Sequence, residues 1–179
     1  MYKATAKLVK AYGLAGITMQ AVAKEADIAT GTLYIYFKNK EALITHLFDV
    51  YIHKYVSAFF SNYDETAPFK VGLHTIWMNI VQHRSTYFDE SIFIEQYIHS
   101  PFIDEDTRAG VKKMFDPLHK LIERGKAERL IKNIDILWLM AFMIGSINEV
   151  SKRAAYYNQQ LTEEILEQNF QMCWDGLKA

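Results

Sequence analysis

Residues 18–43 read TMQAVAKEADIATGTLYIYFKNKEAL, and this stretch decides the fold. Thr18 can cap a helix over Met19–Ala26, because a threonine oxygen accepts a hydrogen bond from a first-turn amide. A short connection at Asp27–Ala29 leads into a second helix at Thr30–Phe37. Two short helices joined in this way have the geometry of a helix-turn-helix, whose second helix can lie in the major groove of DNA. The spacing alone fits an ordinary helical hairpin equally well.

The second of these helices carries side chains suited to DNA. Gly31 has no side chain, so the backbone can approach a duplex closely where the helix begins. Thr30 lies at the N-terminal end, where a recognition helix usually meets base edges. Leu33 and Phe37 are four residues apart and are expected to pack inward. The groups suited to phosphate oxygens belong to Thr32, Tyr34, Tyr36 and, at the start of the following helix, Lys40.

The remainder of the chain predicts helix after helix and no strand of useful length. A short amphipathic helix is expected at residues 3–12. The further helices are expected at residues 40–61, 69–83, 85–99, 104–129, 135–157 and from a Thr162 cap to residue 177. Asp116-Pro117 should kink the helix at 104–129, because the proline ring removes a backbone hydrogen bond. We therefore predict an all-α fold with a three-helix domain at residues 1–43 and a second helical domain at residues 44–179.

Composition bounds the class of protein and its compartment. The net charge is −1, but residues 1–54 hold seven lysines and four acidic residues, a net +3 that leaves −4 for the rest. A basic N-terminal end suits contact with phosphates. Cys173 is the single cysteine, so no intrachain disulfide can form, which favours a reducing compartment. Without an apolar run of roughly 18 residues or a signal peptide, the chain is expected to be cytoplasmic and without a membrane partner.

Gly13, the run at residues 18–26 and the run GTLYIYFKNKEAL at residues 31–43 resemble the TetR family of bacterial transcription regulators. The resemblance covers roughly the first quarter of the chain, and beyond it only the architecture matches. Members of this family are all-helical homodimers whose variable C-terminal domain binds a small molecule and releases DNA. The resemblance thus implies a repressor that binds a palindromic operator in double-stranded DNA. It also implies that residues 44–179 dimerise and bind a small-molecule effector.

By position, the resemblance assigns roles to single residues. Thr18 would contact a phosphate, and Gln20 and Thr30 occupy positions where family members often reach bases. A glutamine can pair with adenine through two hydrogen bonds, whereas a threonine reads bases less specifically. The phosphate-contacting positions of the family match Thr32, Tyr34, Tyr36 and Lys40.

The chain departs from the family pattern in three places. Ala29 stands where a serine is common and so loses a helix cap, unless Thr30 or Asp27 replaces it. Thr30 stands where a basic residue is common. The chain also begins at Met1 almost inside its first helix, where the family commonly carries a basic arm. These departures bear on the strength of operator binding rather than on family membership.

A homodimer is expected because one short recognition helix contacts too few base pairs to be specific, whereas two helices related by a two-fold axis read a palindrome. The last two helices are the candidates for the interface, since apolar residues recur on both at helical spacing. The candidate interface residues are Phe142, Gly145, Leu166, Phe170 and Cys173. The alternative is that these stripes form the core of a single chain.

An effector pocket is expected among the middle helices, where aromatic side chains could line an apolar cavity. The candidate pocket residues are Trp77, Phe93, Tyr97, Phe115 and Trp138. Ordinary core packing is the alternative for each of them. Aromatic and methionine-rich surroundings favour a flat or greasy ligand.

Two other classes of function stay open. In a metal-binding enzyme, Glu95 and His99 could act together with Glu90, but the Glu-x-x-His pair of di-iron bundles is absent. We expect no catalytic residue, no metal and no cofactor. In an adaptor, the fold would persist after the loss of DNA binding, as Ala29 and the short N-terminus would favour.

Overall fold

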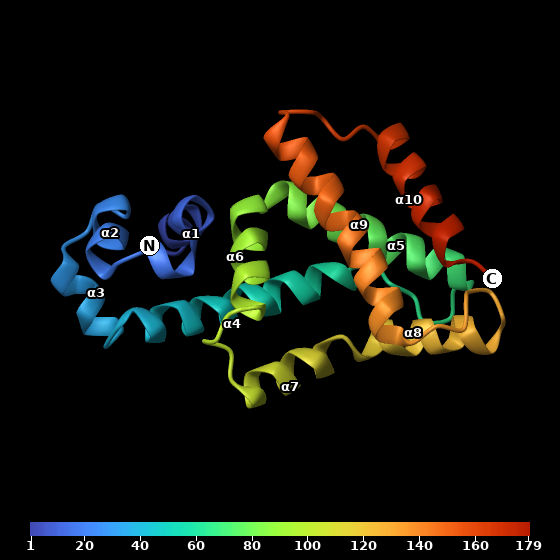
Figure 1. The fold of residues 1–179 in the computed structure, drawn as a ribbon, viewed down its shortest axis with the longest axis horizontal. Coiled ribbons are helices and arrows are strands. Elements are labelled where there is room, and N and C mark those ends of the chain that lie inside the picture. The colour runs from blue at the N-terminus through green and yellow to red at the C-terminus, as the bar shows by residue number, and fades with distance from the viewer. The chain divides into compact units, whose positions relative to one another are not determined.

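The computed structural model describes residues 1–179 and contains ten α-helices (Figure 1). The single piece of β-structure is an isolated antiparallel bridge between Ile131 and Lys178. The helices are α1 (Tyr2–Gly16), α2 (Met19–Glu25), α3 (Thr30–Tyr36), α4 (Lys40–Phe59), α5 (Phe69–Thr86), α6 (Phe88–Ile98), α7 (Glu105–Met114), α8 (Asp116–Ala127), α9 (Ile136–Tyr156) and α10 (Glu163–Leu177). The all-α prediction is confirmed. None of these helices combines the length and the hydrophobicity that crossing a membrane requires.

Several helices begin where the sequence predicts them because the predicted caps form. Thr18 Oγ1 accepts a hydrogen bond from the Ala21 amide at 3.1 Å, and Thr162 Oγ1 accepts one from the Ile165 amide at 3.3 Å. Each bond satisfies an amide that has no partner inside its own helix. The short α2 and the final α10 therefore both begin directly after a threonine.

The interruption predicted at Asp116-Pro117 is present, but it divides residues 104–129 into two helices instead of kinking one. The chain forms two helices there, α7 and α8, which are separated at Phe115. Pro117 lies in the first turn of α8, where its missing amide costs nothing, because first-turn amides have no intrahelical acceptor. At the other end of the chain, α1 extends past the predicted residue 12 to Gly16 and bends at Gly13, whose φ of 72° suits a residue without Cβ.

The contacts within the chain divide it into two compact units. The N-terminal unit comprises residues 1–55 and 87–112, and the C-terminal unit comprises residues 56–86 and 113–179. The predicted boundary after residue 43 falls within the first turn of α4. It stays a prediction about the division of function.

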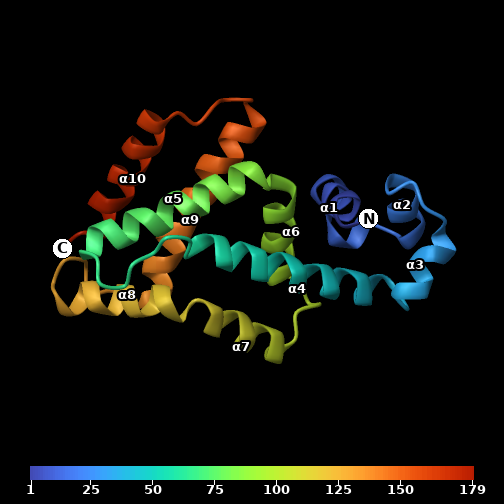
Figure 2. The same cartoon turned by 180° about the vertical axis from the view of Figure 1, so that it is seen from behind.

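The N-terminal unit is built on the packing of α6 beside α1 and α4. Figures 1 and 2 show α6 alongside α1 from both sides. The ring of Tyr97 on α6 stacks on Phe48 of α4, with centroids 4.3 Å apart. The Tyr97 hydroxyl lies 3.1 Å from Thr45 Oγ1 and donates to the Phe102 carbonyl at 3.2 Å. Burial raises the pKa of Tyr97, so this hydroxyl stays protonated.

The C-terminal unit has an aromatic core between α5, α8, α9 and α10. Trp77 of α5 is fully buried and packs edge-on against Phe170 of α10, with centroids 5.8 Å apart. The backbones of α5 and α8 come close where Phe69 covers Gly125. A Cβ at Gly125 would overlap the Phe69 ring, so this position requires glycine.

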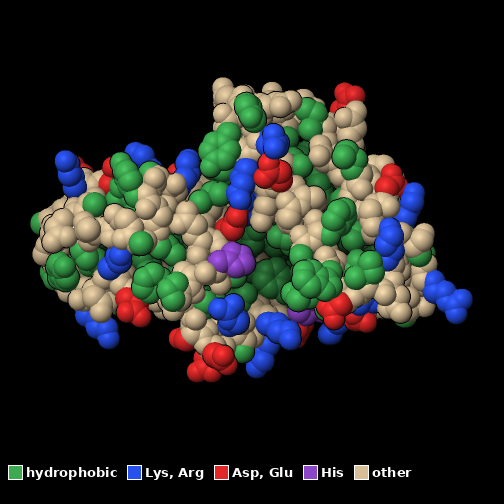
Figure 3. Space-filling view, viewed as in Figure 1, with side chains coloured by type: hydrophobic (Ala, Val, Ile, Leu, Met, Phe, Trp, Pro, Cys, Tyr) green, Lys and Arg blue, Asp and Glu red, His purple; other side chains and the backbone are tan.

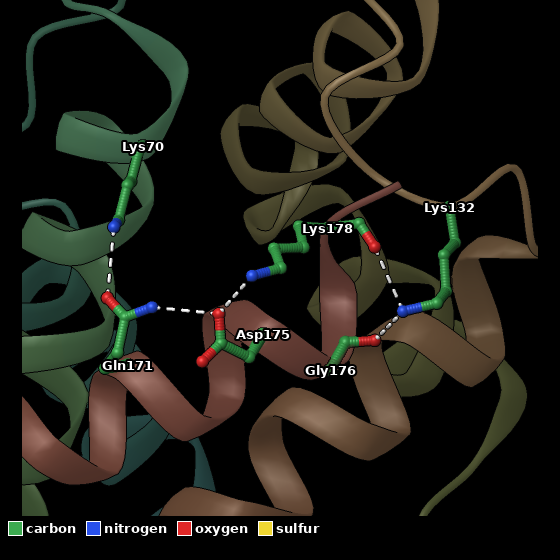
Figure 4. A network of polar contacts seen from close by, with 6 residues as sticks. All are labelled: Lys70, Lys132, Gln171, Asp175, Gly176 and Lys178. Carbon is green, nitrogen blue, oxygen red and sulfur yellow. Dashed lines mark hydrogen bonds and ion pairs between the residues drawn. The ribbon is translucent and has the colours of Figure 1, made fainter.

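A polar network fastens the end of α10 within the C-terminal unit (Figure 4). Lys132 Nζ donates to the carbonyls of Gly176 and Lys178 at 2.6 and 3.0 Å. Asp175 accepts hydrogen bonds from Lys178 Nζ at 2.6 Å and from the Gln171 amide group at 2.9 Å. The bond from Lys178 lowers the pKa of Asp175 below its ordinary value. The final residues are therefore held by side chains as well as by the β-bridge.

Cys173 provides a test of this core. Its side chain is buried, and burial raises the pKa of the thiol, because an apolar interior disfavours the thiolate. A raised pKa leaves less thiolate at any given pH, so we expect Cys173 to react with DTNB at pH 8 at least about a hundredfold more slowly in the folded protein than in 6 M guanidinium. Absorbance at 412 nm measures the rate, and equal rates in the two states would contradict the burial.

Candidate nucleic-acid interface

The helix-turn-helix predicted from the sequence is present as α2 and α3. Four residues, Ala26–Ala29, connect the two helices. Asp27 lies in the left-handed region with a φ of 52°, which aspartate tolerates better than most residues. The Ile28 amide donates to the Ala23 carbonyl at 3.0 Å and closes the end of α2. The turn is therefore fixed by local hydrogen bonds.

The two faces of α3 differ sharply in burial. Leu33 is fully buried and Phe37, directly after the helix, is nearly so. Ile35 and Tyr36 are 78% and 72% exposed. The inward packing predicted for Leu33 and Phe37 is confirmed. Their burial leaves one outer surface of α3 free for a partner, and that surface carries Gly31, Thr32, Tyr34, Ile35 and Tyr36.

The three residues expected to contact DNA from α2 and the start of α3 differ in exposure and in hydrogen bonding. Gln20 in the first turn of α2 is exposed, and Thr30 at the start of α3 is partly buried. The Thr18 hydroxyl oxygen accepts the hydrogen bond that caps α2, and its side chain remains exposed. The assignment of all three to DNA contacts stays a prediction.

The first turn of α3 has no side-chain cap. Ala29 is the N-cap residue and supplies no hydrogen bond. Neither Asp27 nor Thr30 makes a side-chain hydrogen bond that would replace it. The expected loss of the cap is therefore confirmed, and the suggested replacement by Thr30 or Asp27 is wrong. The reason is local, since the left-handed turn at Asp27 satisfies its backbone through α2 instead.

Lys40 has a partner that the sequence did not indicate. Its Nζ donates to the carbonyls of Leu14 and Ala15 at 3.2 and 3.3 Å. These carbonyls lie in the last turn of α1, where no intrahelical amide remains to bind them. Lys40 thus ties α4 to the end of α1, and its contact with a phosphate stays a prediction.

Three of the seven lysines in residues 1–54 form ion pairs within the N-terminal unit. Lys7 pairs with Glu25 at 2.6 Å, Lys10 with Asp89 at 2.6 Å and Lys54 with Glu90 at 2.9 Å. The lysines of residues 1–54 that form no ion pair are Lys3, Lys24, Lys38 and Lys40. The seven lysines of this stretch therefore overstate the number available to phosphates, because three of them are already paired with carboxylates.

A hollow of about 420 Å³ beside α3 was not indicated by the sequence. Tyr2 and His46 form part of its wall, together with Ile28, Thr32 and Tyr36. The Tyr2 hydroxyl lies 2.7 Å from His46 Nε2 and connects the start of α1 to α4. No local pattern links residues 44 positions apart, so only the tertiary structure brings this pair together.

The candidate dimer residues divide between the core and the surface of the C-terminal unit. Phe170 and Cys173 are buried in its interior, and Leu166 is half-buried. For Phe170 and Cys173, the structure therefore favours the core alternative, because their face of α10 packs on α5 and α9. Phe142 and Gly145 on α9 are exposed and remain candidates for an interface.

The candidate pocket residues also differ in burial. Phe93 and Tyr97 are buried in the N-terminal unit, and Trp77 is buried in the C-terminal unit. Phe115 is half-buried, whereas Trp138 is 64% exposed on α9, one turn before Phe142. Trp138 thus lies on the surface that holds the remaining dimer candidates. Its assignment to a pocket, like that of the other four, stays a prediction.

The residues considered for a metal site have other partners or lie apart. Glu90 accepts a hydrogen bond from Lys54 and is mostly buried. The structure contains no cluster of three or more histidine, cysteine, aspartate or glutamate side chains that could hold a metal ion. The Glu90, Glu95 and His99 set is accordingly not assembled into such a site.

Two family models match the chain and together cover most of it. Residues 2–47 match the bacterial regulatory proteins of the tetR family, and residues 68–178 match the tetracyclin repressor-like C-terminal domain. The chain belongs to the TetR family. It is therefore a TetR-family transcriptional regulator whose matched N-terminal region contains the helix-turn-helix described above.

Relatives of this TetR-family chain share its full length. An uncharacterized HTH-type transcriptional regulator from Haemophilus influenzae is 29% identical over 183 residues, which cover 99% of this chain and 94% of that protein. The crystal structure of a TetR family transcription regulator from Marinobacter aquaeolei has a TM-score of 0.88 at 24% identity and covers 99% of this chain and 93% of that one. The transcriptional regulator FadR from Bacillus subtilis, in complex with stearoyl-CoA, has a TM-score of 0.69 at 16% identity, with 98% and 96% covered. At these identities the two solved structures show a shared fold.

Gly31 allows the interface to be tested without disturbing the fold. A Cβ built on Gly31 meets no atom within 4 Å, and alanine favours a helix over glycine by about 0.5–1 kcal/mol. We expect Gly31→Ala to keep or raise the melting temperature while weakening binding to the DNA upstream of its gene about tenfold, because the methyl group would stand between α3 and the duplex. Gel shift and thermal unfolding measure the two effects.

Gly110→Ala on α7 is the matched control, since a Cβ there also meets nothing within 4 Å. It should change stability in the same direction and leave DNA affinity unchanged. Unaltered DNA binding by Gly31→Ala would show that the first turn of α3 stays away from DNA.

Proposed function

We propose that this TetR-family regulator is a non-enzymatic repressor that acts in the cytoplasm. In this proposal it binds a palindromic operator as a homodimer and is released by a small apolar ligand. The observation that carries the proposal is the two-faced α3, with Leu33 buried and Tyr34, Ile35 and Tyr36 exposed. This exposed side of α3 is free to contact a partner, and a major groove accepts a helix of this size.

Hydroxyl groups of the protein would supply most of the contacts with the DNA phosphates. Thr32, Tyr34 and Tyr36 are exposed and offer neutral donors to phosphate oxygens. Gln20 and Thr30 would contact bases, and Lys40 would add a charged contact at the start of α4. Neutral donors release no counterions, so the salt dependence of binding is expected to be weaker than if every lysine of residues 1–54 contacted a phosphate.

The exposed apolar surface of α9 supports a homodimer. Leu137, Trp138 and Phe142 are all exposed on this helix, and Figure 3 shows hydrophobic side chains at the surface along it. Burial against a second copy would remove this apolar area from water. Dimerisation would also place two α3 helices on one palindrome, roughly 34–36 Å apart.

Release by ligand requires a difference in affinity between two conformations. A ligand that binds better to the form unable to grip DNA shifts the population toward that form. The Bacillus subtilis FadR, which shares the fold, is in complex with stearoyl-CoA. A long acyl chain is thus a suitable first probe for the proposed apolar ligand.

Footprinting and titration of the DNA upstream of the gene test the operator. Four lysines in residues 1–54 form no ion pair, which gives eight in a dimer. We expect a protected palindrome and a plot of log K against log salt with a slope no steeper than about −7, against about −13 if all fourteen lysines were available. Adding stearoyl-CoA should reduce the protection.

Opposite results would separate the alternatives. Binding that shows no sequence preference at any salt concentration would reject the repressor and favour an adaptor with the TetR fold. A specific footprint that neither stearoyl-CoA nor free fatty acids reduce would reject an acyl ligand. The operator assignment would then stand alone.

Gly145 tests the dimer without endangering the single chain. It is exposed on α9, and a Cβ there meets no atom within 4 Å. We expect Gly145→Glu to fold with at least wild-type helicity but to sediment as a monomer, because a carboxylate would be buried at the interface. Gly110→Glu on α7 is the control and should remain a dimer. A dimeric Gly145→Glu protein would exclude this face of α9 from the interface.

A further inference from the structure

Helix α1 carries two lysines about one turn apart, and each forms an ion pair with an acidic residue of a different helix. Lys7 Nζ donates to Glu25 Oε1 at 2.6 Å, at the end of α2. Lys10 Nζ donates to Asp89 Oδ1 at 2.6 Å, in the first turn of α6. Because positions i and i+3 lie side by side on a helix, the four charges form a line across α1. This line connects the helix-turn-helix with α6 inside the N-terminal unit.

Asp89, the acidic residue at the α6 end of this line, lies in a helical turn that other contacts hold in place. Glu90, next to Asp89, is mostly buried and accepts a hydrogen bond from Lys54 of α4 at 2.9 Å. The Lys54 ammonium also lies 3.3 Å from the centroid of the Tyr87 ring. A cation held by a buried carboxylate and an aromatic face is restrained from two sides. The first turn of α6 therefore gives Asp89 a fixed position.

The charges along the line act on one another. Glu25 raises the pKa of Lys7 above its ordinary value through a hydrogen bond, and Asp89 adds to that rise through its charge. Asp89 thus acts on Lys7 through its charge, although it contacts only Lys10. Lys10 also lies 5.3 Å from the centroid of the Phe88 ring, which favours the same cation.

We infer that Lys7 and Lys10 are positioning residues for the helix-turn-helix. Lys7 holds the end of α2 on α1, and Lys10 holds α1 on α6, with Asp89 as the anchor. Lys7 restrains the end of α2 just before the turn at Asp27, so its restraint passes directly to the start of α3. The consequence for DNA affinity rests on the proposed function, whereas the restraint itself does not. An exposed ion pair without this connection would change only its own surroundings.

Hydrogen exchange of the full-length protein tests the restraint without DNA. In 50 mM salt, Lys10→Met and Asp89→Asn should each speed exchange of amides in residues 19–36 about two- to fivefold. Lys7→Met should do the same, and Lys7→Met with Lys10→Met should add little, because both act through one line. In 0.5 M salt the differences should shrink, since exposed charges are screened.

Asp175→Asn is the matched control. Its pair with Lys178 has the same 2.6 Å separation and similar exposure but lies in the C-terminal unit. It should leave residues 19–36 unchanged. The inference is overturned if Lys10→Met and Asp89→Asn alter exchange only in α1 and α6, if the double variant is additive, or if Asp175→Asn has an equal effect on residues 19–36.

Operator binding provides a second, separable measurement. Lys10→Met and Asp89→Asn should weaken specific binding by about two- to fivefold, and the charge-swapped pair Lys10→Glu with Asp89→Lys should recover part of the loss. A wild-type protein that binds no specific DNA would reject the proposed function and leave the exchange result standing. Changed exchange with unchanged operator affinity would reject the positioning role in DNA binding.

Discussion

Leu33 and Phe37 lie about one helical turn apart, and the orientation of α3 in the helix-turn-helix depends on their burial. Once these two side chains are packed inward, the helical period leaves Gly31, Tyr34 and Ile35 no direction but outward. The turn before α3 adapts to this demand, since Asp27 takes a left-handed conformation and Ile28 bonds back to α2. The absence of a cap at Ala29 is tolerated because the position of α3 is set by packing rather than by its own hydrogen bonds.

Four lysines of the N-terminal unit form contacts within the unit, so these contacts stabilise the fold. Three of its lysines pair with carboxylates, and Lys40 binds the carbonyls at the end of α1. An ammonium that is already paired releases no counterion on meeting a phosphate, so the basic composition of this region and its affinity for DNA are different quantities. The three paired lysines are not free to bind phosphates, which leaves more of the proposed recognition to hydroxyl groups and to shape.

Phe170 and Cys173 recur at helical spacing, but this spacing does not show whether they pack inside the chain or against a second copy. Apolar residues at helical spacing demand burial, but they do not state against what. In α10 they pack within the chain on Trp77, whereas on α9 Trp138 and Phe142 stay exposed. Phe142 and Phe170 were both predicted for the interface, whereas the structure buries Phe170 and leaves Phe142 exposed beside Trp138.

The sequence by itself determined most of the helices, the helix-turn-helix and its two faces, because caps, breakers and the 3.6-residue period act over a few neighbouring positions. It also showed the family through the motif at residues 31–43. Only the tertiary structure decided the partners of Lys10, Lys40 and His46, and which apolar stripes are core. Those outcomes depend on contacts between remote residues, such as Lys10 and Asp89, which are 79 positions apart. No local sequence pattern specifies which remote side chain will make the contact.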